Sequence, residues 1–300
     1  MTAPHILLLG KGGQVGWELQ RSLAVLGRVT ALDFDSTDHC GDFTNPQGVA
    51  DTVRALRPDI IVNAAAHTAV DKAESEPDLA RIINATTPGT LAQEAARLGA
   101  LLVHYSTDYV FDGSGTRPRT ETDTPAPLSV YGRTKLEGEQ LIQQAGCQHL
   151  ILRTSWVYAA RGGNFAKTML RLAQERERLT IIDDQWGAPT GADLLADVTA
   201  HAIRHLGQRP QDAGLYHLVA AGETTWFSYA KYVFAAVSTA FPAIKIIAKD
   251  ITAVPTSAFP TPATRPHNSR LNTAKLQATF GLQLPHWQQG VQRMLHEVLA

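Results

Sequence analysis

The sequence predicts an α/β fold, with a doubly wound parallel sheet followed by a smaller C-terminal α/β domain. Short apolar runs alternate with longer amphipathic stretches through the first half of the chain. A glycine-rich turn at residues 10–16 joins the first apolar run to the first amphipathic stretch. The second half has a looser pattern with fewer apolar runs. Strands that alternate with helices are typical of a parallel sheet covered by its crossover connections.

The strands and helices of the first half follow from this rhythm. Five apolar runs predict strands at 6–9, 29–32, 60–62, 101–105 and 150–152. Helical spacing between them predicts helices at 15–26, 49–56, 79–98 and 136–145. A parallel sheet with helices on both faces is the expected result.

In the second half, helical spacing recurs with one clear apolar run. We expect helices at 165–174, 194–206 and 226–241, a strand at 179–182 and a terminal helix from Trp287. Four prolines lie between residues 254 and 266. They exclude a regular helix or central strand there and predict a long loop of the kind that often lines a site.

The composition of the chain excludes some classes of binding partner. The 300 residues carry a net charge of -1 with 44% hydrophobic residues. This is an ordinary globular chain without the basic surface of a protein that binds nucleic acid or a membrane. The two cysteines, Cys40 and Cys147, have neither disulfide-framework nor zinc-site spacing. The first apolar run is too short for a signal peptide and no run approaches a membrane span, so we expect a cytoplasmic protein.

The turn Gly10-Lys11-Gly12-Gly13-Gln14-Val15-Gly16 predicts a Rossmann-type dinucleotide site. Gly10 and Gly13 allow backbone N–H groups to approach a pyrophosphate at the helix N-terminus, and Gly16 allows the helix to pack closely on the strand. Asp33 ends the second apolar run, where an acid commonly binds the adenine ribose. Taken alone it favours NADH over NADPH. Acids at strand ends are also ordinary loop residues, so the choice of coenzyme stays open.

Tyr131 and Lys135 are four residues apart at the start of a predicted helix and share one face. A nearby ammonium favours the ionised form of a phenol, which makes the phenol a better acid–base group. Such pairs also occur by chance on solvated helices. The dinucleotide turn favours the catalytic interpretation, as does Thr107 at the end of the preceding strand, where α/β proteins bind ligands. Thr107 could then hold a carbonyl oxygen together with Tyr131.

With these residues in place, the chain resembles the extended short-chain dehydrogenases, and within them the dTDP-4-dehydrorhamnose reductases. The resemblance runs nearly end to end. Its most specific segments are 63–74, 184–190 and 265–271, and it also rests on the glycine-rich turn and on segments 40–43, 105–111 and 153–158.

The resemblance implies NAD(P)H-dependent reduction of the C4 ketone of dTDP-4-dehydro-6-deoxy-L-mannose. The product, dTDP-L-rhamnose, is a sugar donor for cell-surface polysaccharide. By the same analogy Tyr131 delivers the proton, Lys135 supports Tyr131 and the ribose, and Thr107 orients the carbonyl. Residues 1–155 would bind the cofactor, with the chain re-entering that domain around 180–215, and residues 156–300 would bind mainly the sugar nucleotide.

The resemblance also implies further site residues, from their positions in the matching segments. The sugar nucleotide would contact Thr68, Val70, Thr107, Asp108, Tyr131 and Trp156, although Trp156 and Trp186 are also consistent with core aromatics. The cofactor would contact Gly10, Gly12, Gly13, Gln14, Val15, Asp33, Asp42, Phe43, Ala64, Ala65, Ala66, Tyr105 and Lys135. NADPH is the expected coenzyme, with NADH as a second candidate.

Some members of this family are homodimers with Mg²⁺ held at the interface by three acidic residues. These align with Glu18, Asp193 and Glu297, although Asp193 is shorter than the expected glutamate. Acids on solvated helices fit the same three positions equally well.

Two other functions share the fold. An epimerase or dehydratase would reduce and reoxidise the cofactor within one cycle. A dehydratase needs a further acid–base pair, typically Asp-Glu, whereas Thr107 is followed by Asp108-Tyr109. A cofactor-binding regulatory subunit is the non-enzymatic alternative, and the intact pair of Tyr131 and Lys135 argues against it.

Overall fold

Six parallel strands form the central sheet of this computed structural model, which describes residues 3–300. Their order across the sheet is β10-β5-β4-β3-β1-β2. The strands are β1 (His5–Leu9), β2 (Arg28–Leu32), β3 (Ile60–Asn63), β4 (Leu101–Thr107), β5 (His149–Thr154) and β10 (Gly214–His217). The five strands predicted from the sequence are confirmed. The sixth, β10, was missed because its short, mixed sequence GLYH lacks an apolar run.

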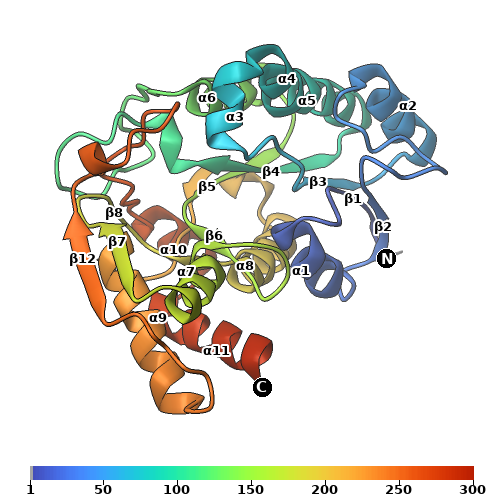
Figure 1. Cartoon of the computed structure of the whole chain (residues 1–300). Helices are drawn as coiled ribbons and strands as arrows, with labels where there is room; N and C mark the ends of the chain where they lie inside the picture. Colours follow the sequence, from blue (N-terminus) through green and yellow to red (C-terminus); the bar gives the residue numbers. More distant parts are fainter. Residues whose placement is uncertain (1–2) are drawn as a thin grey trace.

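Helices cover both faces of the sheet, as predicted (Figure 1). On one face lie α2 (Pro46–Leu56), α5 (Thr87–Leu98) and α6 (Val130–Gln144), and on the other α1 (Gln14–Leu23) and α8 (Ala192–Leu206). Alternation along β1 supplies both cores: Ile6 packs with the α1 and α8 side, and Leu7 with the opposite side.

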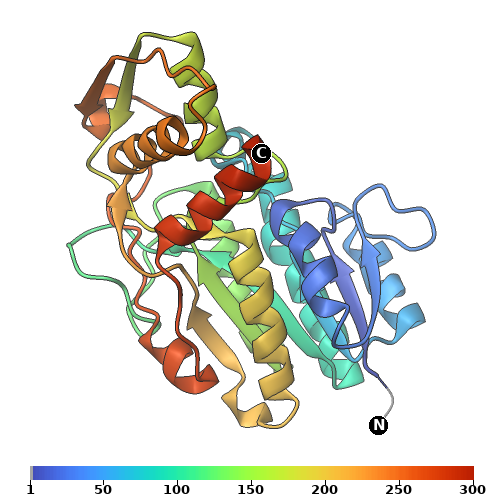
Figure 2. The same cartoon turned by 90° about the horizontal axis from the view of Figure 1, so that it is seen from below.

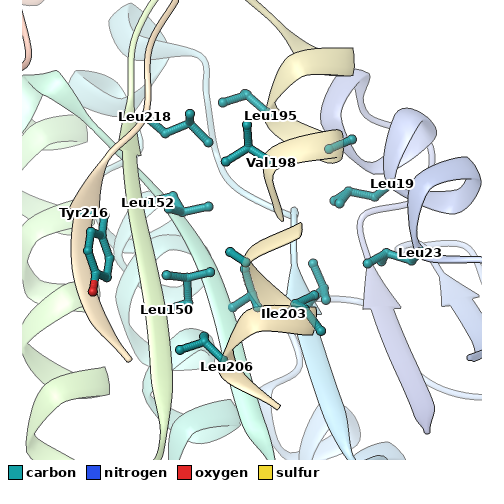
Figure 3. Close-up of a cluster of buried hydrophobic side chains, with 14 of the residues drawn as sticks. Leu19, Leu23, Leu150, Leu152, Leu195, Val198, Ile203, Leu206, Tyr216 and Leu218 are labelled. Atoms are coloured by element: carbon teal, nitrogen blue, oxygen red, sulfur yellow. The ribbon is translucent and has the colours of Figure 1, made fainter. Parts of the chain in front are cut away.

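One of the helices on the sheet comes from the second half of the chain. Leu195 and Val198 of α8 pack against Leu19 and Leu23 of α1 and against strand β5 (Figure 3). The chain thus returns to the sheet after residue 190, first with α8 and then with β10, which pairs with β5. Because of this return, the segments between β5 and α8 lie at the carboxyl edge of the sheet.

A second hydrophobic core lies beyond that edge (Figure 2). Its strands are β7 (Arg178–Ile182) and β12 (Asp250–Val254), which pair in parallel, and its helices are α7 (Phe165–Glu175), α9 (Trp226–Ala240) and α11 (Trp287–Leu299). The loop predicted for 254–266 is largely irregular, but it begins at the last residue of β12 and contains a 3-10 turn at Thr256–Ala258.

The remaining elements are short. They are α3 (Val70–Ser75), α4 (Pro77–Arg81), a π-helical turn (Ile82–Thr86), a 3-10 turn (Asp108–Val110), β6 (Val157–Tyr158), β8 (Trp186–Gly187), β9 (Thr190–Gly191), a second 3-10 turn (Pro210–Asp212), β11 (Thr224–Thr225) and α10 (Ala274–Phe280). The π-helical turn interrupts the single helix predicted for 79–98. Among the helices that the structure describes, none combines the length and apolar character needed to cross a membrane.

Helix α6 starts six residues before the predicted 136. Ser129 caps it by accepting a hydrogen bond from the Gly132 N–H at 3.1 Å. A side chain at position 132 would collide with the Tyr109 carbonyl, so glycine lets α6 approach the turn after β4. Tyr131 therefore lies in the first helical turn, at the carboxyl edge of the sheet.

Candidate active site

The glycine-rich turn has the shape of a dinucleotide cradle. Gly10 has φ +85°, and a side chain there would collide with the backbone of Ala65. Within residues 3–300 no side chain caps α1, so the N–H groups of its first turn stay free for an anionic ligand. Gln14 Oε1 is buried at the same place without a hydrogen-bond partner in that range. These features fit the pyrophosphate of a dinucleotide.

Asp33 and Arg161 lie on either side of this turn. The Asp33 carboxylate accepts hydrogen bonds from the Gly12 N–H at 2.8 Å and the Phe34 N–H at 3.0 Å. The Arg161 guanidinium lies 4.1 Å from the centre of the Trp17 ring, and its Nε donates to the Gly12 carbonyl at 3.4 Å. The turn therefore has one acidic neighbour, from β2, and one basic neighbour, from the loop before α7.

Tyr131, Thr107 and Lys135 lie at the carboxyl end of β4 and the start of α6. Burial raises the pKa of Tyr131 to about 12, while its hydrogen bond with Thr107 acts in the opposite direction. Tyr109 packs edge-on against Tyr131, with ring centres 5.5 Å apart. The structure thus brings Tyr131 and Thr107 together, and Lys135 follows one helical turn later on α6.

Lys135 is 2% exposed, and its Nζ donates to the Tyr105 carbonyl at 2.6 Å. Burial lowers the pKa of Lys135 to about 8, and the charge of Glu139 opposes that shift. Glu139 is itself bound by Arg153 through two hydrogen bonds of 2.8 and 2.6 Å. The carboxylate whose charge acts on Lys135 is thus already paired with another cation.

Asp108 is 2% exposed and follows Thr107 in the turn after β4. Its Oδ1 accepts a hydrogen bond from the Thr107 hydroxyl at 3.0 Å. Burial raises the pKa of Asp108 to about 6, and hydrogen bonds from Ser269 and Thr107 offset only part of that rise. The group can therefore change its protonation state close to neutral pH.

The opposite side of the site is aromatic. Trp156 has φ +50°, a strained backbone conformation for a side chain of this size. Its ring stacks on Trp226 with centres 3.5 Å apart, and Phe165 contacts Trp226 at 4.5 Å. A side chain at Gly187 would collide with the Trp156 ring. This stack, which we call the aromatic side, fixes Trp156 at the edge of the second core.

Thr107, Asp108, Tyr109, Tyr131 and Lys135, at the carboxyl end of β4 and the start of α6, form what we call the sheet side. A cavity of about 260 Å³ lies between Tyr109 of the sheet side and Trp226 of the aromatic side. Its lining combines Tyr109, Phe165, Met169, Thr180, Ile181, Ile182, Gln185, Trp226, Phe259 and Arg265. Arg265 also forms an ion pair with Asp71 of α3 at 2.7 Å. That pair fastens the proline-rich segment to the sheet side of the site, and the Tyr109 ring connects the cavity to Tyr131.

The other predicted residues lie around this centre. Thr68 is exposed and Val70 begins α3, which packs against α6. The Tyr105 phenol is hydrogen-bonded to Thr199 of α8 at 2.6 Å, so this residue reaches the site through its carbonyl group.

The residues expected on the cofactor side follow β2 and β3. The Asp42 carboxylate accepts from the Thr44 N–H and hydroxyl at 2.8 Å, and Phe43 is 4% exposed beneath it. Ala64, Ala65 and Ala66 come directly after β3, next to the glycine-rich turn. Gln14 and Val15 form the first residues of α1.

The residues implied as Mg²⁺ ligands share a small cavity but do not form a metal site. Glu18, Asp193 and Glu297 all line it together with Arg293. Arg293 forms an ion pair with Asp193 at 3.1 Å. In the part of the chain that the structure describes, no three acidic, histidine or cysteine side chains lie close enough to hold a metal ion. The residues of one chain therefore do not fit Mg²⁺.

Sequence reasoning missed several residues around the cavity. Trp226 and Phe165 gave no signal, because aromatic residues at helical spacing are equally consistent with an ordinary core. Gln185 lies in the segment 184–190 that carries the resemblance, but no role was assigned to it. Of the two tryptophans for which a core position was an alternative, Trp186 is not in the core: it is 38% exposed and lies beneath the Arg270 guanidinium at 4.6 Å.

Comparison with known proteins places the chain in a family. Residues 4–300 match the family described as the RmlD substrate binding domain. A dTDP-4-dehydrorhamnose reductase of Escherichia coli K12 is 63% identical, over 99% of this chain and 98% of that protein. One from Burkholderia thailandensis is 45% identical, over 98% of this chain and 99% of that protein.

Solved structures agree with this result. A dTDP-4-dehydrorhamnose reductase from Clostridium acetobutylicum has a TM-score of 0.88 at 34% identity, covering 99% of this chain and 100% of that one. One from Bacillus anthracis, in complex with NADP, has a TM-score of 0.86 at 34% identity and the same coverage. A Thermus thermophilus UDP-glucose 4-epimerase, at 20% identity over 98% of both chains and a TM-score of 0.79, shares the fold alone. The chain therefore belongs to the dTDP-4-dehydrorhamnose reductase family of oxidoreductases.

Proposed function

We propose that this enzyme uses NADPH to reduce the C4 ketone of dTDP-4-dehydro-6-deoxy-L-mannose, giving dTDP-L-rhamnose for cell-surface polysaccharide. The observation that carries the proposal is the grouping of Tyr131, Thr107 and Lys135 beside a dinucleotide cradle. The aromatic cavity beyond Tyr109 offers room for the rest of a sugar nucleotide. Family membership supplies the identity of the substrate.

NADPH supplies the hydride when it is bound in the cradle of Gly10, Gly12, Gly13, Gln14 and Val15. When substrate binds, Thr107 turns its single hydroxyl donor from Asp108 to the sugar carbonyl and holds that carbonyl near Tyr131. The Tyr131 hydroxyl, kept protonated by a pKa of about 12, gives its proton to the alkoxide that forms at C4. The Lys135 ammonium then stabilises the phenolate and binds the nicotinamide ribose.

Substrate recognition falls to residues on both sides of the cavity. Arg265 is the cation among the cavity-lining residues, so we assign it to a phosphate of the nucleotide. Trp156, on the aromatic side, and Asp108, beside Thr107, are assigned to the sugar. Thr68 and Val70 contribute from the segment before and at the start of α3.

The surroundings of the glycine-rich turn support use of both coenzymes. Arg161 offers a positive charge beside the turn, whereas the Asp33 carboxylate favours a free ribose 2'-hydroxyl over a 2'-phosphate. We infer that NADPH is used and that NADH is a second substrate. The cofactor assignment extends to Asp42, Phe43, Ala64, Ala65, Ala66 and Tyr105.

The assignment to a net reductase is favoured over the two alternatives. The turn Thr107-Asp108-Tyr109 lacks the Asp-Glu pair of a dehydratase. A regulatory subunit would have no need for a buried lysine beside a tyrosine at the carbonyl site. We further infer a homodimer in the cytoplasm, whose second chain would have to complete any Mg²⁺ site at Glu18, Asp193 and Glu297, because Arg293 pairs with Asp193 within one chain.

The test is nicotinamide oxidation, followed by absorbance, on mixing the protein with enzymatically prepared dTDP-4-dehydro-6-deoxy-L-mannose and either coenzyme. Stoichiometric oxidation by the wild type is expected. Tyr131→Phe should lower kcat by about 10²–10⁴-fold and leave coenzyme binding intact. If both coenzymes bind and neither is consumed, the reductase proposal fails.

A further inference from the structure

His104 is a buried histidine that the reaction above does not use. It lies in β4 and is 1% exposed, and its ring nitrogens face Asn63 of β3 and Lys135 of α6. Asn63 and His104 are direct partners in the parallel ladder. This chain of three side chains ends on the lysine that supports the catalytic tyrosine.

The backbone fixes the direction of the hydrogen bonds along that chain. The Ala65 N–H can only donate, and it donates to Asn63 Oδ1 at 3.0 Å. The Asn63 amide must therefore turn its Nδ2 toward His104 Nδ1, which is 2.9 Å away. Nδ2 carries only donors, so Nδ1 accepts, and a neutral His104 carries its proton on Nε2.

The remaining contact then places two hydrogen-bond donors opposite each other. His104 Nε2 lies 3.3 Å from Lys135 Nζ. An ammonium has three donors and no acceptor, whereas a neutral amine has a lone pair that can accept the Nε2–H. The opposite His104 tautomer would satisfy the ammonium but would place Nδ1–H against the Asn63 amide donor. The network is thus fully satisfied only when Lys135 is neutral.

We propose that His104, anchored through Asn63 to the Ala65 backbone, is a positioning residue that opposes the ammonium form of Lys135. Lys135 then gains and loses its proton near neutral pH, where it can exchange protons with Tyr131 during turnover. The inference rests on the proposed function for its role in the reaction. The hydrogen-bond order does not depend on that function.

The charges around Lys135 agree with this arrangement. On α6, Tyr131 lies one turn before Lys135, and Glu139 lies one turn after it. Glu139 accepts two hydrogen bonds from Arg153 of β5 and one from Ser106 of β4, so most of its acceptor capacity is already used. Burial lowers the pKa of His104 well below its usual range, with a further contribution from the Lys135 charge, so the imidazole stays neutral. Burial likewise lowers the pKa of Lys135 to about 8.

The first test reads the tautomer in the wild-type protein by ¹⁵N NMR of the histidine side chains, without any turnover. The expected result is a neutral His104 with its proton on Nε2 from about pH 6 to 9, within the range where an ordinary histidine would titrate near 6.5. A proton on Nδ1, or a charged imidazole, overturns the proposal. This result stands or falls independently of the substrate assignment.

The second test is the pH dependence of kcat in His104→Gln and Asn63→Asp. In the first variant the introduced glutamine can turn its amide oxygen to the ammonium. In the second, the introduced carboxylate accepts from Nδ1–H of His104 and so frees Nε2 to accept. Both changes should move the alkaline limb of the profile upward, toward the ordinary lysine pKa of about 10.4.

The control is His217→Gln, which alters another fully buried histidine and should leave that limb in place. An unmoved limb in active His104→Gln overturns the proposal.

Discussion

The two sides of the site are held in place by different forces. On the sheet side, Thr107, Asp108 and Lys135 are at most 4% exposed, and hydrogen bonds to neighbouring backbone or side chains fix them. On the aromatic side, Trp156 and Trp226 stack on each other, and Trp226 Nε1 also donates a hydrogen bond to Gln185 Oε1 at 3.0 Å.

This difference gives the two sides different roles: the sheet side acts in the chemical step, and the aromatic side contributes to substrate affinity. Proton transfer needs donors and acceptors held within a fraction of an ångström, and hydrogen bonds to strand ends provide such placement. Stacked rings supply shape and apolar area, which bind a substrate equally well before and during reaction. Damage to the sheet side should therefore lower kcat, and damage to the aromatic side should raise KM.

The largest effect is expected at Lys135. Lys135→Met keeps the apolar stem but removes the charge that stabilises the Tyr131 phenolate, so kcat should fall by about 10²–10⁴-fold. Steady-state kinetics at saturating coenzyme measure this. Lys275→Met is the matched control, because Lys275 Nζ also donates to a backbone carbonyl, that of Leu215, on the distant α10. Equal losses in both variants would contradict the role of Lys135.

The next largest effect is expected at Arg153, which supports the sheet side through its ion pair with Glu139. Arg153 and Glu139 form an ion pair in which both side chains are at most 3% exposed. Arg153→Met leaves a buried carboxylate without its partner, which should cost about 3–5 kcal/mol of unfolding free energy. Urea unfolding measures this loss.

The control for that change is an ion pair whose arginine is exposed and whose carboxylate, Glu94, is 3% exposed and has two cationic partners. Arg97 pairs with Glu94 but is 61% exposed, and Arg54 also binds Glu94. Arg97→Met should therefore cost under about 1 kcal/mol. If the two substitutions cost the same, burial does not determine the strength of the Arg153 pair.

The same division explains how far sequence reasoning reached. The sheet side was predicted because its residues follow apolar strands at fixed spacing: Thr107 ends β4, and Tyr131 and Lys135 are four residues apart. The aromatic side was not predicted, because Trp226 contacts Trp156 only through tertiary packing. The β10 strand and the cap at Ser129 were missed for a related reason: neither produces a periodic apolar pattern.

A smaller effect should appear in the pH dependence of stability through Asp108. Its pKa is raised to about 6 in the folded protein, against an ordinary value of about 3.9, so the folded state binds the proton more tightly. The stability that this group contributes is therefore present below about pH 4 and is lost as pH rises through 6. Over that range the change is about 3 kcal/mol.

The matched variant is Asp108→Asn, which keeps the shape and cannot ionise. Its unfolding free energy relative to the wild type should rise between pH 4 and pH 7 and level off above that. Urea titrations of both proteins across this range give the difference directly. Parallel curves would mean that Asp108 is not perturbed by burial.

The smallest effect is expected on the aromatic side, from Trp226→Leu. The change removes the stacking partner of Trp156 while leaving an apolar residue at the start of α9. Aromatic pairs are worth about 0.5–1.5 kcal/mol beyond area burial, so KM for the sugar nucleotide should rise by up to about tenfold. The kcat value and the KM for NADPH, measured in the same assays, should stay within about twofold. A fall in kcat without a change in KM would show that the stack positions the reacting groups, and the division between the two sides of the site would not hold.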